Sequence, residues 1–313
     1  MALIVLIFLI SGLGMDAKQV WAGFKHWRLL LVAQSLSLLF APLLMFGVTS
    51  LLRGHVNSGI LDGAVLVSVV PTTISSAYVL TVEMHGNTGA ALVQCTFGNF
   101  IGVFITPGWL LLLLRSSENV RHSDEGSGTS TSAQIGKSLL TLGGTVVLPL
   151  VVGMLVRRFG GERVQAFNKR TKAITGFVNK FSLFIIVFFA FCESFASGAF
   201  GLLAGADLAV SAALCVGLHF VLLAVASLIG ARLLKFSRAD TVAVTLCSAQ
   251  KTLALAMPLL ALFFNDVGAG LVAVPILMYH PMQVALGGIL TVRIRRWVDA
   301  AAPPPDTPLR PMS

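Results

Sequence analysis

Charged side chains are scarce in this sequence of 313 residues. Asp, Glu, Lys and Arg make up 11% of it and hydrophobic residues 56%, with a mean hydropathy of +0.88. A soluble domain is typically about 25% charged, because polar side chains must cover its surface. The composition therefore excludes an ordinary soluble protein and indicates a membrane protein.

Catalytic and metal-binding motifs are also missing. The four cysteines (Cys95, Cys192, Cys215 and Cys247) lie in or at the ends of apolar segments without metal-ligand spacing, so we expect them to be reduced and structural. No nucleophile–base pair, glycine-rich phosphate loop or cluster of metal ligands is recognisable. We therefore expect neither an enzyme nor a bound metal or cofactor.

Acidic residues are outnumbered by basic ones, 13 to 22, which gives a net charge of +9 and a pI of 9.9. Such a balance can indicate nucleic-acid binding. Here, however, the basic residues lie in short segments between apolar runs, as membrane topology requires. We therefore expect contact with membrane lipid and none with nucleic acid.

Long apolar runs are what the sequence does contain. A helix needs roughly 20 apolar residues to cross a bilayer core of about 30 Å, and runs of this length are too continuous for barrel strands. The sequence predicts an all-α membrane protein with nine helices. With approximate ends, they are Ala2–Met15, Leu29–Leu52, Gly59–Val82, Gly89–Leu114, Ser138–Val156, Ile174–Cys192, Leu208–Leu234, Thr241–Phe264 and Gly270–Thr291.

The basic segments predict the orientation of the chain. If the nine helices alternate across the membrane, four segments rich in Lys and Arg fall on one side: 16–28, 157–172, 232–238 and 293–296. The positive-inside rule makes that side cytoplasmic. The C-terminus is then cytoplasmic and Met1 lies outside, in either the plasma membrane or a secretory-pathway membrane.

The polar stretches divide the chain. Residues 115–137, rich in Ser and Gly, predict a flexible linker between a first membrane half (1–114, four helices) and a second (138–297, five helices). Residues 298–313 predict a disordered cytoplasmic tail. The first apolar run is only about 14 residues, or roughly 21 Å of helix. We therefore expect the true start to lie upstream, with one more helix before it; a tilted helix in a thinned bilayer is the alternative.

Two spans are interrupted near their middle. In the third, Pro71 removes a backbone donor, and the hydroxyls after it can bond the freed backbone groups or coordinate an ion. In the eighth, a polar run is followed by Pro258, expected as a second helix break. Paired interruptions at corresponding places in two halves are typical of a transporter's midplane binding site. The polar residues concerned are Thr72, Thr73, Ser75 and Ser76 in the third span, and Ser248, Gln250, Lys251 and Thr252 in the eighth.

Lys251 is the most informative single residue. An ammonium group at the centre of a bilayer costs about 2.5–3.5 kcal/mol on insertion scales, so the side chain is not expected to face lipid. We predict that it binds a substrate or takes part in ion binding. The alternative is that it only holds the unwound carbonyl groups together.

Other polar residues inside spans are weaker candidates for the same site. They either face the interrupted spans or serve packing between helices. His280 either relays protons or bonds the carbonyl freed by Pro281, and His219 is the weakest candidate. The remaining candidates are Gln94, Cys95, Thr96 and Asn99 in the fourth span, and Gln34 and Ser37 in the second.

The third and fourth spans, PTTISSAYVLT and HGNTGAALVQCTFGNFIGVFITP, resemble the bile acid:sodium symporter superfamily. The second half, with RADTVAVTLCSAQKTLALAMPLLALFF and VAVPILMYHPMQVALGGIL, is similar to the SBF-like branch typified by member 7 of solute carrier family 10 and its fungal calcium-regulating relatives. The resemblance runs from about Leu3 to Trp297. It implies a ten-helix inverted-repeat fold with panel and core domains and two crossing broken helices. It also implies that the first of the ten family helices is missing from this chain.

The resemblance also implies two sodium sites. The first would fall on Ser75 or Ser76, Cys95 and Asn99, and the second near Gln250, with Ser37 or Gln34.

This sequence departs from the sodium-coupled pattern at two positions. Sodium-coupled members carry a Glu serving both ions where this chain has Leu246, and an Asn where it has Lys251. Ordinary two-sodium coupling is therefore not expected. We hypothesise that the positive charge of the Lys251 ammonium partly replaces that of a bound sodium ion. The ammonium then binds an anionic substrate or exchanges a proton.

Three functions compete. The branch implies a transporter-fold protein that acts in calcium homeostasis by restraining calcium entry, with an unknown small solute or ion as its substrate. The second is a sodium-driven carrier of bile-acid-like organic anions, against which Leu246 argues. The third is a non-transporting regulator that binds a calcium channel or pump through the basic segment Arg157–Lys172.

Overall fold

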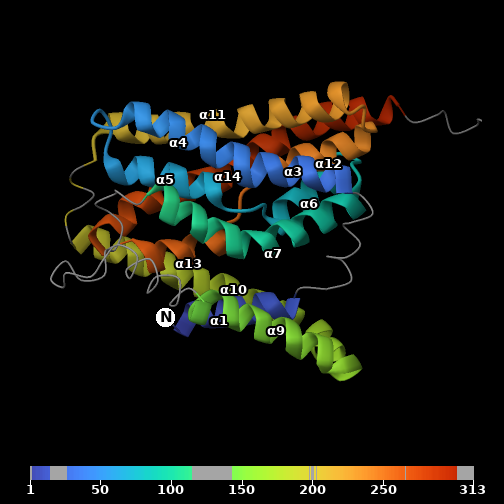
Figure 1. The fold of residues 1–313 in the computed structure, drawn as a ribbon, viewed down its shortest axis with the longest axis horizontal. Coiled ribbons are helices and arrows are strands. Elements are labelled where there is room, and N and C mark those ends of the chain that lie inside the picture. Colours follow the sequence, from blue (N-terminus) through green and yellow to red (C-terminus); the bar gives the residue numbers. More distant parts are fainter. Residues whose placement is uncertain are drawn as a thin grey trace, which may run out of the picture.

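The computed structural model describes residues 2–14, 27–114, 143–196, 198, 201, 203–264 and 266–301, which form a bundle of helices (Figure 1). The linker expected at 115–137, the basic residues Lys18 and Lys25, and the tail from 302 lie outside these residues. The elements are α1 (Ala2–Gly14), α3 (Trp27–Ser35), the π-helix η2 (Leu36–Phe40), α4 (Ala41–Leu52), α5 (Ser58–Val69), α6 (Ile74–Glu83), α7 (Thr88–Leu113), the π-helix η3 (Gly143–Val147), α9 (Leu148–Phe159), α10 (Gly161–Ala196), α11 (Gly205–Leu228), the π-helix η5 (Ile229–Leu233), α12 (Arg238–Ala249), α13 (Leu253–Phe263) and α14 (Asp266–Asp299).

The expected all-α membrane fold is confirmed. Within the described ranges each predicted span corresponds to one helix or to a run of consecutive helices, and the third and eighth spans each consist of two short helices. Four segments are long and apolar enough to cross a membrane by length and composition: Trp27–Leu52, Thr88–Leu113, Gly205–Leu233 and Ala269–Asp299.

The basic segment expected as a loop after the fifth span is helical, which corrects the sequence prediction. Arg157 and Arg158 form the last turn of α9, and α10 begins at Gly161. Gly161 has φ +57°, a left-handed conformation that glycine adopts without strain, so the chain reverses within two residues. The residues that follow include no proline and continue the helix. The last helix likewise includes Val298 and Asp299, at the start of the expected tail.

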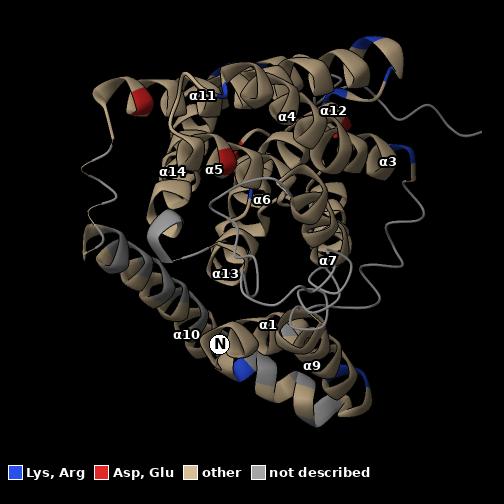
Figure 2. Ribbon diagram, turned by 60° about the vertical axis from the view of Figure 1, so that its left-hand side comes forward, with Lys and Arg blue, Asp and Glu red and all other residues tan. Residues whose placement is uncertain are grey.

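The helices divide into two groups. Figures 1 and 2 show α1, α9 and α10 on one side of the molecule and the remaining helices packed together on the other. The resemblance implies panel and core domains without saying which helices form each; that division and the inverted-repeat relation between the halves stay predictions.

Glycines allow α1 and α9 to approach closely. A Cβ atom on Gly12 would lie 2.2 Å from the carbonyl oxygen of Leu150, and one on Gly153 would lie 2.5 Å from that of Leu9. Small residues of this kind bring the backbones of membrane helices into contact, where lipid gives no hydrophobic driving force.

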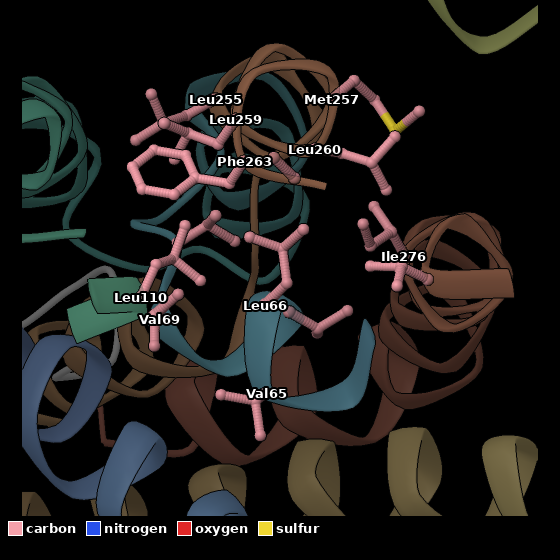
Figure 3. Close-up of a cluster of buried hydrophobic side chains, with 14 of the residues drawn as sticks. Val65, Leu66, Val69, Leu110, Leu255, Met257, Leu259, Leu260, Phe263 and Ile276 are labelled. Atoms are coloured by element: carbon pink, nitrogen blue, oxygen red, sulfur yellow. The ribbon is translucent and has the colours of Figure 1, made fainter. Parts of the chain in front are cut away.

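An apolar cluster packs the second broken span against its neighbours. Figure 3 shows side chains of α13 facing those of α5, α7 and α14. Leu255, Leu259 and Leu260 of α13 are buried there with Leu66 of α5 and Ile276 of α14. The close packing holds the α13 half of the broken span in place relative to α5.

The charged residues gather at helix ends (Figure 2). The start of α3, the end of α9, the start of α12 and the end of α14 lie at one end of the bundle, at the right in Figure 1. Arg238 at the start of α12 donates to the carbonyl of Trp297 near the end of α14. The helix ends next to the described parts of the basic segments therefore lie at the same end of the bundle.

Candidate functional site

The first broken span changes direction at Pro71. Helix α5 ends at Val69, and Val70 is extended (φ −76°, ψ 149°), as expected of a residue that precedes proline. The Pro71 ring packs on α7, where a Cβ on Gly102 would lie 2.6 Å from its Cγ. The break therefore has two local causes, the missing N–H of Pro71 and the glycine that admits its ring.

The second break lies at residues 250–252, and this corrects the expectation for Pro258. That proline lies inside α13, whose backbone stays helical from Leu253 to Phe263. Gln250 and Thr252 are extended instead, with ψ of 123° and 131°. The Thr252 hydroxyl accepts from the Ala254 N–H at 3.1 Å and caps the new helix.

The two extended segments cross and bond to each other. Thr72 and Lys251 form an isolated antiparallel bridge, and Thr252 N donates to Pro71 O at 3.0 Å. The Thr72 hydroxyl donates to Cys247 O, and Asn99 Nδ2 donates to Thr72 O at 2.6 Å. Each extended segment thus supplies hydrogen-bond partners for the backbone of the other. Unwound backbone inside a membrane needs such partners, because lipid offers none.

Lys251 lies at this crossing with its side chain in a cage of oxygens. The residue is 2% exposed. Its Nζ donates to Ser37 O at 2.7 Å and to Ser37 Oγ, Ser68 O and Val70 O at 3.0 Å each. An ammonium has three N–H groups, so four acceptors engage all of them. All four acceptors are uncharged.

The local structure explains why these carbonyls are free to accept. Ser68 and Val70 lie at the end of α5, where the last carbonyls of a helix have no intrahelical donor and the helix dipole is negative. Ser37 lies in the π-turn η2, a distortion that is frequent at functional sites. The structure therefore directs carbonyl dipoles at one buried point, which Lys251 Nζ occupies.

Gln283, absent from the sequence candidates, fixes the backbone of Lys251. Its Oε1 accepts from Lys251 N at 2.6 Å and its Nε2 donates to Lys251 O at 2.8 Å. One sign of Gln283 is present in the sequence, because it is a polar residue in an apolar span, three residues after His280. Ser68, Val70 and Tyr279 were also missed; Tyr279 donates to Ala249 O at 2.8 Å.

Several candidates from the third and fourth spans do meet the eighth. Ser76 Oγ donates to Gln250 Oε1 at 2.8 Å. The thiols of Cys95 and Cys247 are 3.6 Å apart, and Cys95 also lies 3.6 Å from Thr73 O. The residues assigned by resemblance to the first sodium site are thus close to the crossing, with Ser75 directed to Thr73 at 3.2 Å.

Other candidates have local or separate partners. Ser248 and Thr96 donate to carbonyls of their own helices. Gln34 donates to the Gln94 carbonyl at 3.1 Å, away from Lys251, so Ser37 is the residue of the second span that meets the ammonium. His280 Nδ1 contacts Gln283 Nε2 at 3.0 Å rather than a carbonyl freed by Pro281.

Leu246, the position where the sodium-coupled pattern has a Glu, is buried among apolar side chains. It packs in a cluster with Leu80, Met84 and Val242. Its surroundings suit an aliphatic side chain.

Comparison with known proteins identifies the family of this chain. The model of the SBF-like CPA transporter family matches residues 1–296. Sodium/bile acid cotransporter 7 of Mus musculus is 33% identical over 299 residues, covering 93% of this chain and 82% of that protein. The Danio rerio protein of the same name is 31% identical, with 94% and 83% covered. Solute carrier RCH1 of Candida albicans is 28% identical, with 95% and 80% covered.

Proposed function

This chain belongs to the SBF-like CPA transporter family of the bile acid:sodium symporter superfamily, and from that premise we propose that it is a membrane carrier whose central cation is its own Lys251. The carrier then works without ordinary two-sodium coupling. It acts in cellular calcium homeostasis by restraining calcium entry.

The contacts of Lys251 carry this proposal. Its Nζ binds four neutral oxygens, the kind of ligands that a hard monovalent cation prefers. One of the residues involved, Ser37, is an alternative that the resemblance gives for the second sodium site. A sodium ion at the same point would face the ammonium within a few ångströms, and like charges in a buried site repel strongly.

Leu246 supports the same conclusion independently. The resemblance implies that sodium-coupled members have a Glu here that serves both ions, whereas this chain has an aliphatic side chain packed among apolar ones. The ammonium supplies a positive charge that needs no carboxylate, because carbonyl dipoles and the end of α5 stabilise it.

The occupied cage also bears on substrate binding. All three N–H groups of Lys251 already have acceptors, so in this conformation the ammonium has no free donor for an anionic substrate. The role proposed for Lys251 is therefore to hold the crossing together electrostatically while the substrate binds elsewhere.

Calcium homeostasis is proposed from the resemblance of the second half to a branch with fungal calcium-regulating members. Several relatives are named sodium/bile acid cotransporter 7, which favours a sodium-coupled carrier of organic anions as the second candidate. Lys251 and Leu246 together argue against that candidate.

Labelled-calcium uptake tests the proposal. Cells lacking their own relative would express this chain, Lys251→Ala, or nothing, with Lys235→Ala as a control at an exposed lysine and with surface expression matched. We expect the chain and the control to lower uptake and Lys251→Ala to lose the effect. If Lys251→Ala lowers uptake equally well, a regulator that binds a calcium channel or pump is favoured instead. Equal uptake in all four would contradict the calcium role.

A further inference from the structure

The side chain of Gln283 contacts two groups, the backbone of Lys251 and the ring of His280. Its Oε1 lies 2.6 Å from Lys251 N, and its Nε2 lies 2.8 Å from Lys251 O and 3.0 Å from His280 Nδ1. A backbone N–H only donates and a carbonyl oxygen only accepts, so the backbone of Lys251 leaves this amide one orientation. The amide cannot turn round without losing both bonds to Lys251.

The orientation of the amide determines which nitrogen of His280 carries the hydrogen. Gln283 Nε2 has two hydrogens and donates one of them to Lys251 O. An amide nitrogen does not accept, so at its contact with the ring it donates the other hydrogen and His280 Nδ1 accepts. The hydrogen-bond network therefore assigns the neutral ring its hydrogen on Nε2 and leaves Nδ1 without one.

The His280 ring is not sealed inside the crossing. The residue is partly exposed, whereas Gln283 and Lys251 are buried. In the part of the chain that the structure describes, Gln283 is the hydrogen-bond partner of the ring. The accessible ring therefore connects to the buried break through one hydrogen bond.

We propose that His280 Nδ1 is a proton-binding site that controls the support of the second break by Gln283. An added proton and the N–H of Gln283 compete for the same lone pair, and both nitrogens of an imidazolium are donors. Two donors would then face each other across a contact of 3.0 Å, and because the amide cannot turn round, the two side chains separate. The only covalent change is the new N–H bond on His280.

Charged groups elsewhere do not take over this role in the described ranges. The Lys251 ammonium is directed at oxygens of the second and third spans. Of the elements packed against α14, α13 has no titratable residue, and α14 has its own charges at its two ends. Away from the basic end of the bundle, the charged or basic side chains on the other elements are Asp62 of α5, Lys180 and Glu193 of α10, and Asp207 and His219 of α11.

The described members of this set have other partners. Asp62 is paired with Arg53, Asp207 accepts from the backbone N–H of Asn57, and His219 contacts Tyr279. Proton binding at His280 is therefore governed by its contact with Gln283.

The position of the site links proton binding to the centre of the crossing. Separation from His280 removes one of the bonds that hold the Gln283 amide against Lys251, whose ammonium occupies the oxygen cage. In the carrier proposed above, a proton would then be the ion whose binding and release move the crossing. This link to transport rests on the proposed function, while the site itself rests on the hydrogen bonds of Gln283.

Thermal unfolding of the purified full chain in detergent, at about pH 8 and about pH 5.5, tests the site. His280→Asn is the matched variant, because its amide oxygen can accept from Gln283 at the place of Nδ1 and does not titrate. The bond to Gln283 stabilises the chain at the higher pH and is lost as the pH falls. We expect acidification to lower the unfolding midpoint of the unaltered chain by a few degrees more than that of His280→Asn. This excess should vanish when both chains also carry Gln283→Met.

Equal changes of the midpoint in the unaltered chain and in His280→Asn would overturn the proposal. An excess that survives Gln283→Met would also overturn it, because the proton would then act through another contact.

Hydrogen exchange in the unaltered chain decides the question if a variant folds poorly. Corrected for the intrinsic effect of pH on exchange, protection of the Lys251 amide should fall on acidification. Protection of the Ala254 amide, which the Thr252 hydroxyl caps, should not change. Unchanged protection of the Lys251 amide would contradict the proposal. Neither readout depends on transport, so a failure here leaves the proposed function to the calcium-uptake assay.

Discussion

At the scale of single residues, the positive charge of Lys251 is stabilised by dipoles rather than by a carboxylate. Transferring an ammonium group out of water costs several kcal/mol even after relaxation. Four oxygen contacts at 2.7–3.0 Å compensate for this cost, and two of the four oxygens are carbonyls at the end of α5. The charge and the free carbonyls therefore stabilise each other, and removing either leaves the other unpaired in the interior.

Gln283→Met tests the support of Lys251 by its neighbour on α14. The change should leave the N–H and C=O of Lys251 without their partners, costing roughly 1–3 kcal/mol of unfolding free energy for each group. The unfolding midpoint in detergent should fall accordingly. Thr291→Val in the same helix is the control, because Thr291 donates only to the carbonyl of Gly287 one turn away. Equal midpoints for the two variants would show that the Gln283 bonds do not support the break.

The sequence identifies Lys251 but not all of its partners. A lysine far from either end of an apolar span is conspicuous, because such a side chain is costly in lipid. Ser68 and Val70 act through backbone carbonyls, which every residue has, so their side chains give no signal. Gln283 is recognisable in the sequence as a polar residue in an apolar span. That it bonds to Lys251 depends on how α14 packs against the crossing, which the sequence does not show.

At the scale of elements, the two interrupted spans show that a proline marks a helix break in one case and not in the other. Pro71 predicts its break because the preceding residue becomes extended and a neighbouring glycine admits the ring. Pro258 sits in a helix that continues through it, and the break occurs earlier, where tertiary bonds replace helical ones. Those partners come from the third span and α14, so the eighth span alone does not reveal the exact place.

The contact of α1 with α9 gives a prediction at this scale. Gly153→Val should push the two helices apart, because even a Cβ atom would lie 2.5 Å from Leu9 O. We expect a lower unfolding midpoint and a lower yield of folded protein. Gly217→Val in α11 is the matched control, since nothing lies within 4 Å of a Cβ at that position. Comparable stability of the two variants would contradict close packing of α1 on α9.

At the scale of the whole molecule, hydropathy predicted which segments are helical better than it predicted where each helix begins and ends. The apolar runs identify the helices because a run of that length has few alternatives in lipid. The basic segment after the fifth span proved helical, because the apolar pattern marks only the part of a helix that lies in the membrane. The grouping of α1, α9 and α10 depends on packing between distant segments, and the sequence did not predict it.

Orientation gives the whole-molecule prediction. The end of the bundle where α9 and α14 end should face the cytoplasm, because Lys and Arg flank those helix ends. An epitope added after Ser313 should react with antibody only after the cells are permeabilised. A tag placed between Arg53 and Val56, at the opposite end, should react in intact cells. The reverse pattern would contradict the assigned orientation.

The central claim is that the Lys251 ammonium fills a cation position. Its most direct test is the unfolding midpoint of the unaltered chain and of Lys251→Ala in sodium chloride and in choline chloride at equal ionic strength. We predict that the unaltered chain unfolds at the same temperature in both salts. Lys251→Ala should unfold earlier in choline chloride and recover part of the difference in sodium chloride, as sodium enters the vacated oxygen cage. Stabilisation of the unaltered chain by sodium, or a variant as stable as the unaltered chain in choline chloride, would contradict the claim.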